Sequence, residues 1–258
     1  MPSSGGSTGR QVVVTGGSKG IGKAIVERFA EIGDAVVALG RDEASLKEVA
    51  HEQSERGFSV DYSVCDVTSE DSVQEVFGRL SSVDVLVNNA GTSRSAPIHK
   101  TTLDEWQEQM AVNATAAFLC TRAVVSSMRE RNGGRIVFVA SIAGVAGYRY
   151  TAAYTASKHA EIGLMRAVAA EVVGTGVTAN AVCPTYVRTP MTERSAARIA
   201  EKTGRSEQEA VDAMSSTSPL GRLLEPEEVA ATVAFLASEE AGAINGELVI
   251  MDGGGIQR

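Results

Sequence analysis

The sequence has few cysteines and histidines, and it lacks an excess of basic residues. Its three cysteines, Cys65, Cys120 and Cys183, are isolated, odd in number and without the spacing of metal ligands. We interpret them as buried apolar side chains in a reducing compartment. The three histidines form no spaced group either, so no metal site is predicted. The net charge of −8 argues against nucleic acid as a partner, because a phosphate backbone binds to a basic surface.

Long apolar runs are missing as well, and no membrane association is predicted. Residues 1–9 are rich in serine and glycine without the apolar segment of a signal peptide, so we expect a disordered tail on a cytoplasmic protein. The composition, 43% hydrophobic and 22% charged, is ordinary for a soluble globular protein. Residues 10–258 are enough for one large domain with a full core.

Short β-branched runs alternate with longer helical stretches along the chain. Strands are expected over residues 11–15, 35–39, 58–65, 83–87, 135–140, 177–182 and 248–251. Helices are expected over 21–32, 43–55, 68–80, 102–131, 152–173 and 226–238. The strands are continuous apolar runs, which is typical of a parallel sheet covered on both faces. The predicted fold class is therefore α/β, a single-domain doubly wound (Rossmann-like) parallel sheet of about seven strands.

The turn after the first strand has the sequence TGGSKGIG, from Thr15 to Gly22. Glycines let the backbone turn sharply and approach a pyrophosphate, and the following helix offers its N-terminal N–H groups to negative charge. The spacing differs from the GxGxxG fingerprint, and a tight turn without a ligand is the alternative. Its place between a strand and a helix near the start of the chain favours nucleotide binding.

The end of the second strand distinguishes between two dinucleotides. An acidic residue there binds the adenosine ribose and repels a 2′-phosphate, whereas an arginine attracts that phosphate. This chain has Arg41 after the strand and Lys19 in the glycine-rich turn, which predicts NADP(H) as the cofactor. Asp42 competes for the ribose, but it lies late, and we interpret it as a helix N-cap. Solvated surface charges are the alternative interpretation of the two cations.

Tyr154 and Lys158 lie four positions apart in a stretch rich in helix formers. Residues four apart stack on one face of a helix, so we expect the Lys158 ammonium beside the Tyr154 phenol. A cation at that place favours the tyrosinate and makes the phenol effective in proton transfer near neutral pH. Taken alone, this motif could also be an ordinary surface pair.

Together these motifs resemble those of the short-chain dehydrogenases/reductases, over nearly the whole chain from Gln11 to Gly254. The glycine-rich turn is similar to the cofactor turn of that family, and Asn88–Gly91 is similar to its NNAG segment. The resemblance implies a catalytic tetrad of Asn113, Ser141, Tyr154 and Lys158. It also implies a cofactor site made of Gly16, Ser18, Lys19, Gly20, Ile21, Gly22, Arg41, Asp66, Val67, Asn89, Ala90, Gly91, Tyr154, Lys158, Pro184, Val187 and Thr189.

The resemblance implies a role for each member of the tetrad. Ser141 would orient the substrate oxygen, and Tyr154 would transfer the proton, as general acid in reduction or as base in oxidation. Lys158 would assist the tyrosine electrostatically and bind the nicotinamide ribose. Asn113 would hold a water molecule that connects Lys158 to solvent.

The segment 186–221 lies between a strand and a helix and contains two polar helical stretches. Long insertions at the carboxyl end of a strand are often lids, and in the resembled family this segment binds the substrate. The alternative is that the segment is a solvent-exposed helical insertion and not a lid. Thr185 precedes the segment where the family usually has glycine, and its β-branched side chain would narrow or polarise the pocket.

The motifs are most similar to those of bacterial polyketide ketoreductases and 3-oxoacyl-carrier-protein reductases, enzymes of polyketide or fatty acid biosynthesis. The hypothesis is therefore an NADPH-dependent oxidoreductase that reduces a small-molecule ketone, 3-oxoacyl or polyketide-like, free or bound to CoA or a carrier protein. One alternative is a dehydrogenase that oxidises a small secondary alcohol or hydroxy acid. A non-catalytic NADP(H)-sensing protein is another, although the complete tetrad argues against it.

Assembly is inferred from small side chains. The helices predicted over 102–131 and 152–173 carry faces rich in alanine and valine, which permit close helix packing. In the resembled family such helices form dimers and the last strand completes tetramers, so a homotetramer with 222 symmetry is expected.

Overall fold

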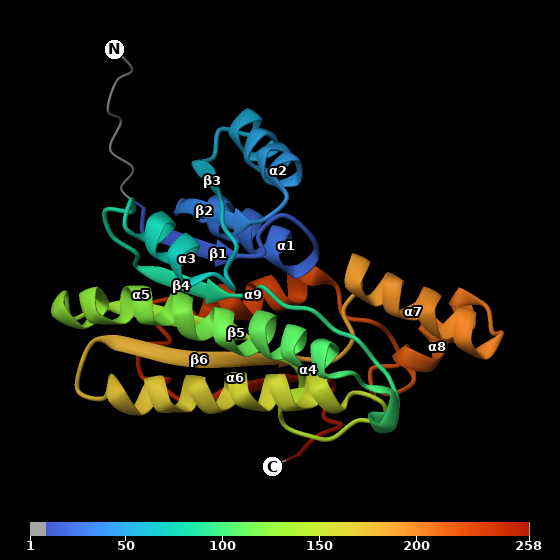
Figure 1. The fold of residues 1–258 in the computed structure, drawn as a ribbon. Helices are drawn as coiled ribbons and strands as arrows, with labels where there is room; N and C mark the ends of the chain where they lie inside the picture. Colours follow the sequence, from blue (N-terminus) through green and yellow to red (C-terminus); the bar gives the residue numbers. More distant parts are fainter. Residues whose placement is uncertain (1–8, 258) are drawn as a thin grey trace.

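The computed structural model describes residues 9–257, so the predicted tail, apart from Gly9, lies outside the described residues. Within them the chain forms a seven-stranded parallel sheet of order β3-β2-β1-β4-β5-β6-β7 (Figure 1). The strands are β1 (Gln11–Thr15), β2 (Ala35–Gly40), β3 (Val60–Val64), β4 (Val85–Asn88), β5 (Gly134–Val139), β6 (Val177–Pro184) and β7 (Leu248–Met251). The predicted doubly wound, Rossmann-like fold is confirmed. Its strand order reverses direction between β1 and β4, where such folds bind ligands.

Helices cover both faces of the sheet (Figure 1). They are α1 (Gly20–Glu31), α2 (Glu43–Glu55), α3 (Glu70–Phe77), α4 (Leu103–Met110), α5 (Ala116–Glu130), α6 (Ala152–Glu171), α7 (Pro190–Thr203), α8 (Glu207–Ser215) and α9 (Pro226–Leu236).

Successive residues of each strand enter two different hydrophobic cores. Val13 of β1 belongs to the core that the sheet shares with α3, α5 and α6. Its neighbours Val12 and Val14 belong to the opposite core, shared with α1, α2 and α9. Because side chains alternate across a strand, a continuous valine-rich run fills both cores at once.

The helix predicted over 102–131 is interrupted, since a π-helical turn, Ala111–Thr115, joins α4 to α5. An 18-residue window of the stretch Leu103–Glu130 has a mean hydropathy of 1.2, so this stretch is long and apolar enough to cross a membrane by length and composition alone. The sequence did not indicate this, because charged residues such as Glu108 and Arg122 interrupt the apolar run. Residues of α5 pack in the core of the domain, which accounts for its apolar face.

Helices α7 and α8 form a separate small layer after β6. Thr189 caps α7 by accepting a hydrogen bond from Thr192 N, and Gly204 ends that helix in the left-handed region at φ 73°. Ser206 caps α8. The two helices share a small core made of Ala196, Ala210, Met214 and Leu223. They extend outward from the main body (Figure 1).

Candidate active site

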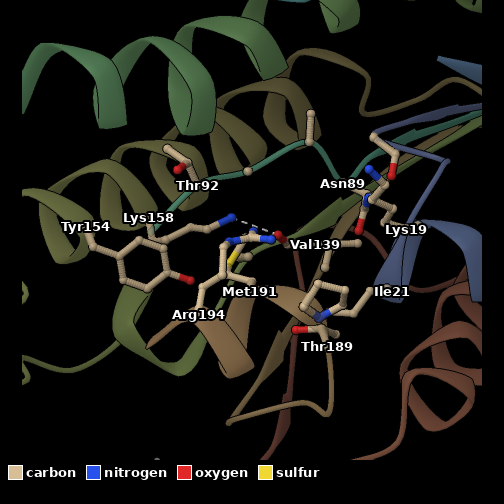
Figure 2. Close-up of a pocket in the computed structure, with 17 residues that line it drawn as sticks. Lys19, Ile21, Asn89, Thr92, Val139, Tyr154, Lys158, Thr189, Met191 and Arg194 are labelled. Atoms are coloured by element: carbon tan, nitrogen blue, oxygen red, sulfur yellow. Dashed lines mark hydrogen bonds between the residues drawn. The ribbon is translucent and has the colours of Figure 1, made fainter. Parts of the chain in front are cut away.

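Two adjoining cavities open at the carboxyl ends of the strands. The first lies between the glycine-rich turn after β1, the segment after β4 and the start of α7 (Figure 2). The second lies between the end of β5, the loop before α6 and the segment after β6. The residues common to both are Ile21, Ala140, Tyr154, Thr189 and Met191. Two ligands could therefore meet at this shared wall.

Glycines determine the shape of the turn in the first cavity. Gly16 at φ 67° and Gly20 at φ 53° lie in the left-handed region. A Cβ at Gly22 would lie 2.0 Å from the Gly16 oxygen, so only glycine fits there. The N-terminus of α1 has no side-chain cap and lines this cavity. Its N–H groups are placed to bind an anion such as a pyrophosphate.

Thr15, at the end of β1, joins the glycine-rich turn to the segment after β4. Its hydroxyl accepts hydrogen bonds from Asn89 N at 2.9 Å and Ala90 N at 3.0 Å, and it donates to Val87 O at 3.3 Å. The Asn89 side chain returns the contact, because Nδ2 donates to Thr15 O at 2.9 Å and Gly16 O at 3.2 Å. The base of the first cavity is therefore one hydrogen-bonded unit built from two strand ends.

Helix α6 directs Tyr154 and Lys158 into the first cavity (Figure 2). The Lys158 side chain is buried, and its Nζ donates to Val139 O at 2.9 Å and to Glu161 Oε2 at 2.7 Å. Burial alone would lower the pKa of Lys158, but the charges of Glu161 and of an ionised Tyr154 outweigh it, so the pKa is raised. The lysine therefore stays protonated on the helix face that it shares with the phenol, as the spacing predicts.

Asn113 lies in the π-helical turn and is fully buried. Its Oδ1 accepts a hydrogen bond from Thr92 N at 2.8 Å, and its Nδ2 donates to Thr92 O at 3.0 Å and Ser157 Oγ at 2.8 Å. A Cβ at Gly91 would lie 3.4 Å from Asn113 Oδ1 and 3.8 Å from Lys158 Nζ. Gly91 is thus packed beside both the amide and the ammonium.

Ser141, at the end of β5, lines the second cavity together with Tyr154. Its Oγ accepts a hydrogen bond from Ala143 N at 3.1 Å, a contact that uses a lone pair and not the hydroxyl proton. Thr185 also lines this cavity, is 7% exposed, and has no hydrogen-bond partner for Oγ1 among the described residues. Its side chain therefore lies in the wall of the cavity that we expect it to narrow or polarise.

Comparison with known proteins identifies the family. Residues 10–200 match the family described as short chain dehydrogenase. The chain belongs to the short-chain dehydrogenases/reductases. A 3β-hydroxysteroid dehydrogenase of Mediterraneibacter gnavus is 38% identical over 94% of this chain and 93% of its own length. An acetoacetyl-CoA reductase of Rhizobium meliloti is 38% identical over 95% of this chain and 98% of its own length.

Among solved structures, a variant of actinorhodin polyketide ketoreductase with NADPH is 35% identical and superposes with a TM-score of 0.91. The match covers 98% of this chain and 99% of that one. The predicted similarity to polyketide ketoreductases and 3-oxoacyl-carrier-protein reductases is confirmed.

Most of the cofactor residues predicted for this short-chain dehydrogenase/reductase line a cavity. The first cavity includes Gly16, Lys19, Gly20, Ile21, Gly22, Asn89, Ala90, Gly91, Tyr154, Lys158 and Thr189. The second adds Pro184 and Val187. Ser18, Arg41, Asp66 and Val67 line neither of them.

Lys19 is engaged by a neighbouring carboxylate. Its Nζ donates to Asp42 Oδ2 at 2.8 Å. Asp42 Oδ1 also accepts a hydrogen bond from Ser45 N at 3.2 Å, which confirms its predicted role as the N-cap of α2. The hydrogen bonds from Lys19 and Ser45 hold the pKa of the Asp42 carboxyl well below its usual range. The two predicted cations therefore differ, because only Lys19 is held in this capping network.

Arg41 is exposed at the end of β2, close to the segment after β3. The pKa of Asp66 is lowered, first by hydrogen bonds from Thr68 and to a smaller extent by the charge of Arg41. Arg41 thus lies on the side of the glycine-rich turn where the sequence places the adenosine end of the cofactor.

Sequence reasoning missed several side chains at the site. Thr92, Met191 and Arg194 line the first cavity, and the segments that carry them meet only in the folded chain. Glu161 forms a buried ion pair with Lys158. Its spacing of three residues from Lys158 on a helix could have identified it, because such residues share a face.

Proposed function

We propose that this protein reduces a ketone to a secondary alcohol with NADPH, with Tyr154 as the proton donor. The observation that carries the proposal is the position of Tyr154 at the wall shared by the two cavities. Lys158 lines the first of them and Ser141 the second. A cofactor in the first cavity and a ketone in the second would therefore meet beside one phenol.

The first cavity fits the pyrophosphate of a dinucleotide. Its three glycines form a cradle that a side chain would fill, and the uncapped N-terminus of α1 opens onto it. We assign the pyrophosphate to this cradle, the adenine to Asp66 and Val67, and the 2′-phosphate to Arg41. The related ketoreductase solved with NADPH supports NADP(H) as the cofactor.

Bound NADPH supplies the hydride, and the side chains of this chain handle the proton. Tyr154 would donate its phenolic proton to the carbonyl oxygen. Ser141, in the same cavity, would donate a hydrogen bond that orients this oxygen. The Lys158 ammonium would stabilise the tyrosinate that remains. Asn113, which holds the backbone at Thr92, would position a water molecule for reprotonation.

We assign the substrate to the 3-oxoacyl or polyketide-like ketones. Support comes from the relatives named for acetoacetyl-CoA and polyketide reduction. The second cavity is bordered by Met191, Thr192 and Ser195 at the start of α7. The segment 186–221 would therefore act as a helical lid on one catalytic domain, 10–258, in a cytoplasmic homotetramer.

Steady-state assays with NADPH and a panel of ketones test the function. The panel should contain acetoacetyl-CoA, a neutral 3-oxo ester and a bicyclic ketone, with the matching alcohols and NADP⁺ for the reverse direction. Tyr154→Phe is expected to lower kcat by at least about a thousandfold, within the range of lost acid catalysis and positioning, and to leave the Kd for NADPH nearly unchanged.

Two outcomes would contradict this function. Tight NADPH binding without turnover of any panel member would favour a sensor. A Tyr154→Phe variant with wild-type kcat would remove the tyrosine from the chemistry.

A further inference from the structure

A buried carboxylate lies directly against the proposed catalytic lysine. Glu161 is 1% exposed, and its Oε2 accepts a hydrogen bond from Lys158 Nζ at 2.7 Å. The same ammonium donates to Val139 O on β5 at 2.9 Å. Two acceptors from different elements therefore hold Nζ in one place, and the buried charges of Glu161 and Lys158 depend on each other.

We propose that Glu161 is a positioning residue for Lys158, whose protonation state determines how much of the ammonium charge acts on the Tyr154 phenol. This inference rests on the proposed function, in which Lys158 and Tyr154 act together. An ionised Glu161 makes the pair nearly neutral as seen from the phenol. A protonated Glu161 no longer offsets the ammonium, and Lys158, whose pKa the charge of an ionised Tyr154 also raises, then acts on the phenol with its full positive charge.

The burial of the Glu161–Lys158 pair allows the Glu161 carboxyl to change its charge near neutral pH. Burial raises the pKa of Glu161 to about 7, although the charge of Lys158 opposes this. Glu161 therefore gains a proton as the pH falls through neutrality, where an exposed glutamate would remain ionised.

Few other titratable groups face the pair. Tyr154 on the same helix and Cys183 on β6 act on Lys158. The packed segments Ala111–Thr115 and Ile142–Gly144 carry no ionisable side chain. Arg135, the ionisable residue of β5, lies at the start of that strand and donates to Ser238 O and Gly176 O. The acidic residues of α4, which also packs against α6, are either exposed or part of its N-terminal cap.

The pH dependence of catalysis tests the proposal. The measurement is kcat/KM for alcohol oxidation with NADP⁺ between about pH 5 and pH 10, where the rate rises as the general base forms. Glu161→Gln keeps a hydrogen-bond acceptor but removes the charge, so the rising limb is expected to move by about one unit to lower pH. At a fixed pH on that limb the rate should be about tenfold higher than for the wild type. Glu171→Gln, an exposed change on the same helix, should leave the profile unchanged.

A second measurement, an NMR titration, does not depend on turnover. In the cofactor-free protein labelled with ¹³C at glutamate carboxyls, one carboxyl signal is expected to titrate near neutrality. This titration should be seen in the wild type and in Glu171→Gln and should be absent from Glu161→Gln. If every glutamate titrates below about pH 5.5, as ordinary carboxyls do, the proposal is overturned.

Glu161→Asp covers the case in which Glu161→Gln does not fold. It keeps the charge on a shorter arm and should keep a rising limb like that of the wild type. An Asp variant with the limb moved to lower pH would overturn the proposal.

If Tyr154→Phe is inactive but the pH profile of Glu161→Gln superimposes on that of the wild type, this inference alone is refuted. An active Tyr154→Phe variant would remove it together with the proposed function.

Discussion

Lys19 and Arg41 carry the same charge but differ in their surroundings. Lys19 Nζ donates to Asp42 at 2.8 Å, within the capping network of α2. Arg41 is exposed and acts only weakly on the pKa of Asp66. An ion pair that already exists must be broken before its cation can bind a phosphate, which reduces the gain. We therefore expect Arg41 to contribute most of the preference for a 2′-phosphate.

Replacing Arg41 tests this difference. Arg41→Asp should lower the ratio of kcat/KM for NADPH to that for NADH by at least about tenfold, because it replaces attraction of the 2′-phosphate with repulsion. Lys19→Ala is the matched variant and should change the ratio less. Steady-state kinetics with both cofactors measure the effect. A ratio that is equal in Arg41→Asp and the wild type would contradict the assignment.

At the scale of single residues, the sequence could predict those that belong to local motifs. Tyr154 and Lys158 share one helix face, and their spacing alone places them together. It could not predict that Lys158 also meets Val139, because this contact depends on how α6 packs on β5. The pairing of Lys19 with Asp42 was missed for the same reason, since it joins a turn to a helix 23 residues later.

At the scale of elements, helices α1 and α6 each contain a glycine in opposite surroundings. Gly22 in α1 has no room for a side chain, since its Cβ would lie 2.0 Å from Gly16 O and 2.5 Å from Asn89 Nδ2. Gly163 in α6 has open space where its Cβ would be. The first glycine is required by the close approach of two backbones, and the second is a weak point in its helix.

Alanine at the two positions should have opposite effects. Gly22→Ala should destabilise the protein and weaken NADPH binding, because the turn must open to admit the methyl group. Gly163→Ala should stabilise the fold by about 0.5–1 kcal/mol, the usual gain for an exposed helix interior. Denaturant unfolding and NADPH fluorescence titration measure both effects. Wild-type affinity and stability in Gly22→Ala would show that the turn does not need a glycine there.

The sequence predicted helices and strands correctly where the hydrophobic pattern was strong. It was less accurate where tertiary packing determines the bounds of an element. Strand β3 was predicted over 58–65 but spans Val60–Val64. It lies at the sheet edge and, within residues 9–257, pairs with β2 alone, so fewer of its residues find partners. The π-helical turn around Asn113 was not predicted either, because no sequence pattern marks it and its polar side chain is satisfied by Thr92 and Ser157.

At the scale of the whole molecule, three large apolar side chains are exposed on α4 and α5. Leu103 is 69% exposed, Trp106 40% and Phe118 43%. The guanidinium of Arg122 lies 5.1 Å from the centre of the Phe118 ring. Exposed apolar side chains of this size are typical of surfaces that bind another protein. They lie on α4 and α5, within the stretch 102–131 that we expect to take part in the dimer contact.

The oligomeric state tests this expectation. Light scattering in solution should give four times the chain mass of 26.9 kDa. Phe118→Glu should reduce the mass to that of a dimer or monomer, because it buries a charge at a symmetric contact. Ile32→Glu, an equally exposed apolar site after α1, is the control and should remain tetrameric. A monomeric wild type would refute the tetramer.

The bonds between Thr15 and Asn89 also bear on how this enzyme could be re-engineered. They join the turn after β1 to the strand end at β4 through both side chains and both backbones. A change at either position would therefore disturb the other, and the base of the cavity offers little scope for gradual variation. New cofactor specificity should be easier to obtain at the rim, at positions such as Arg41, whose replacement leaves these bonds intact.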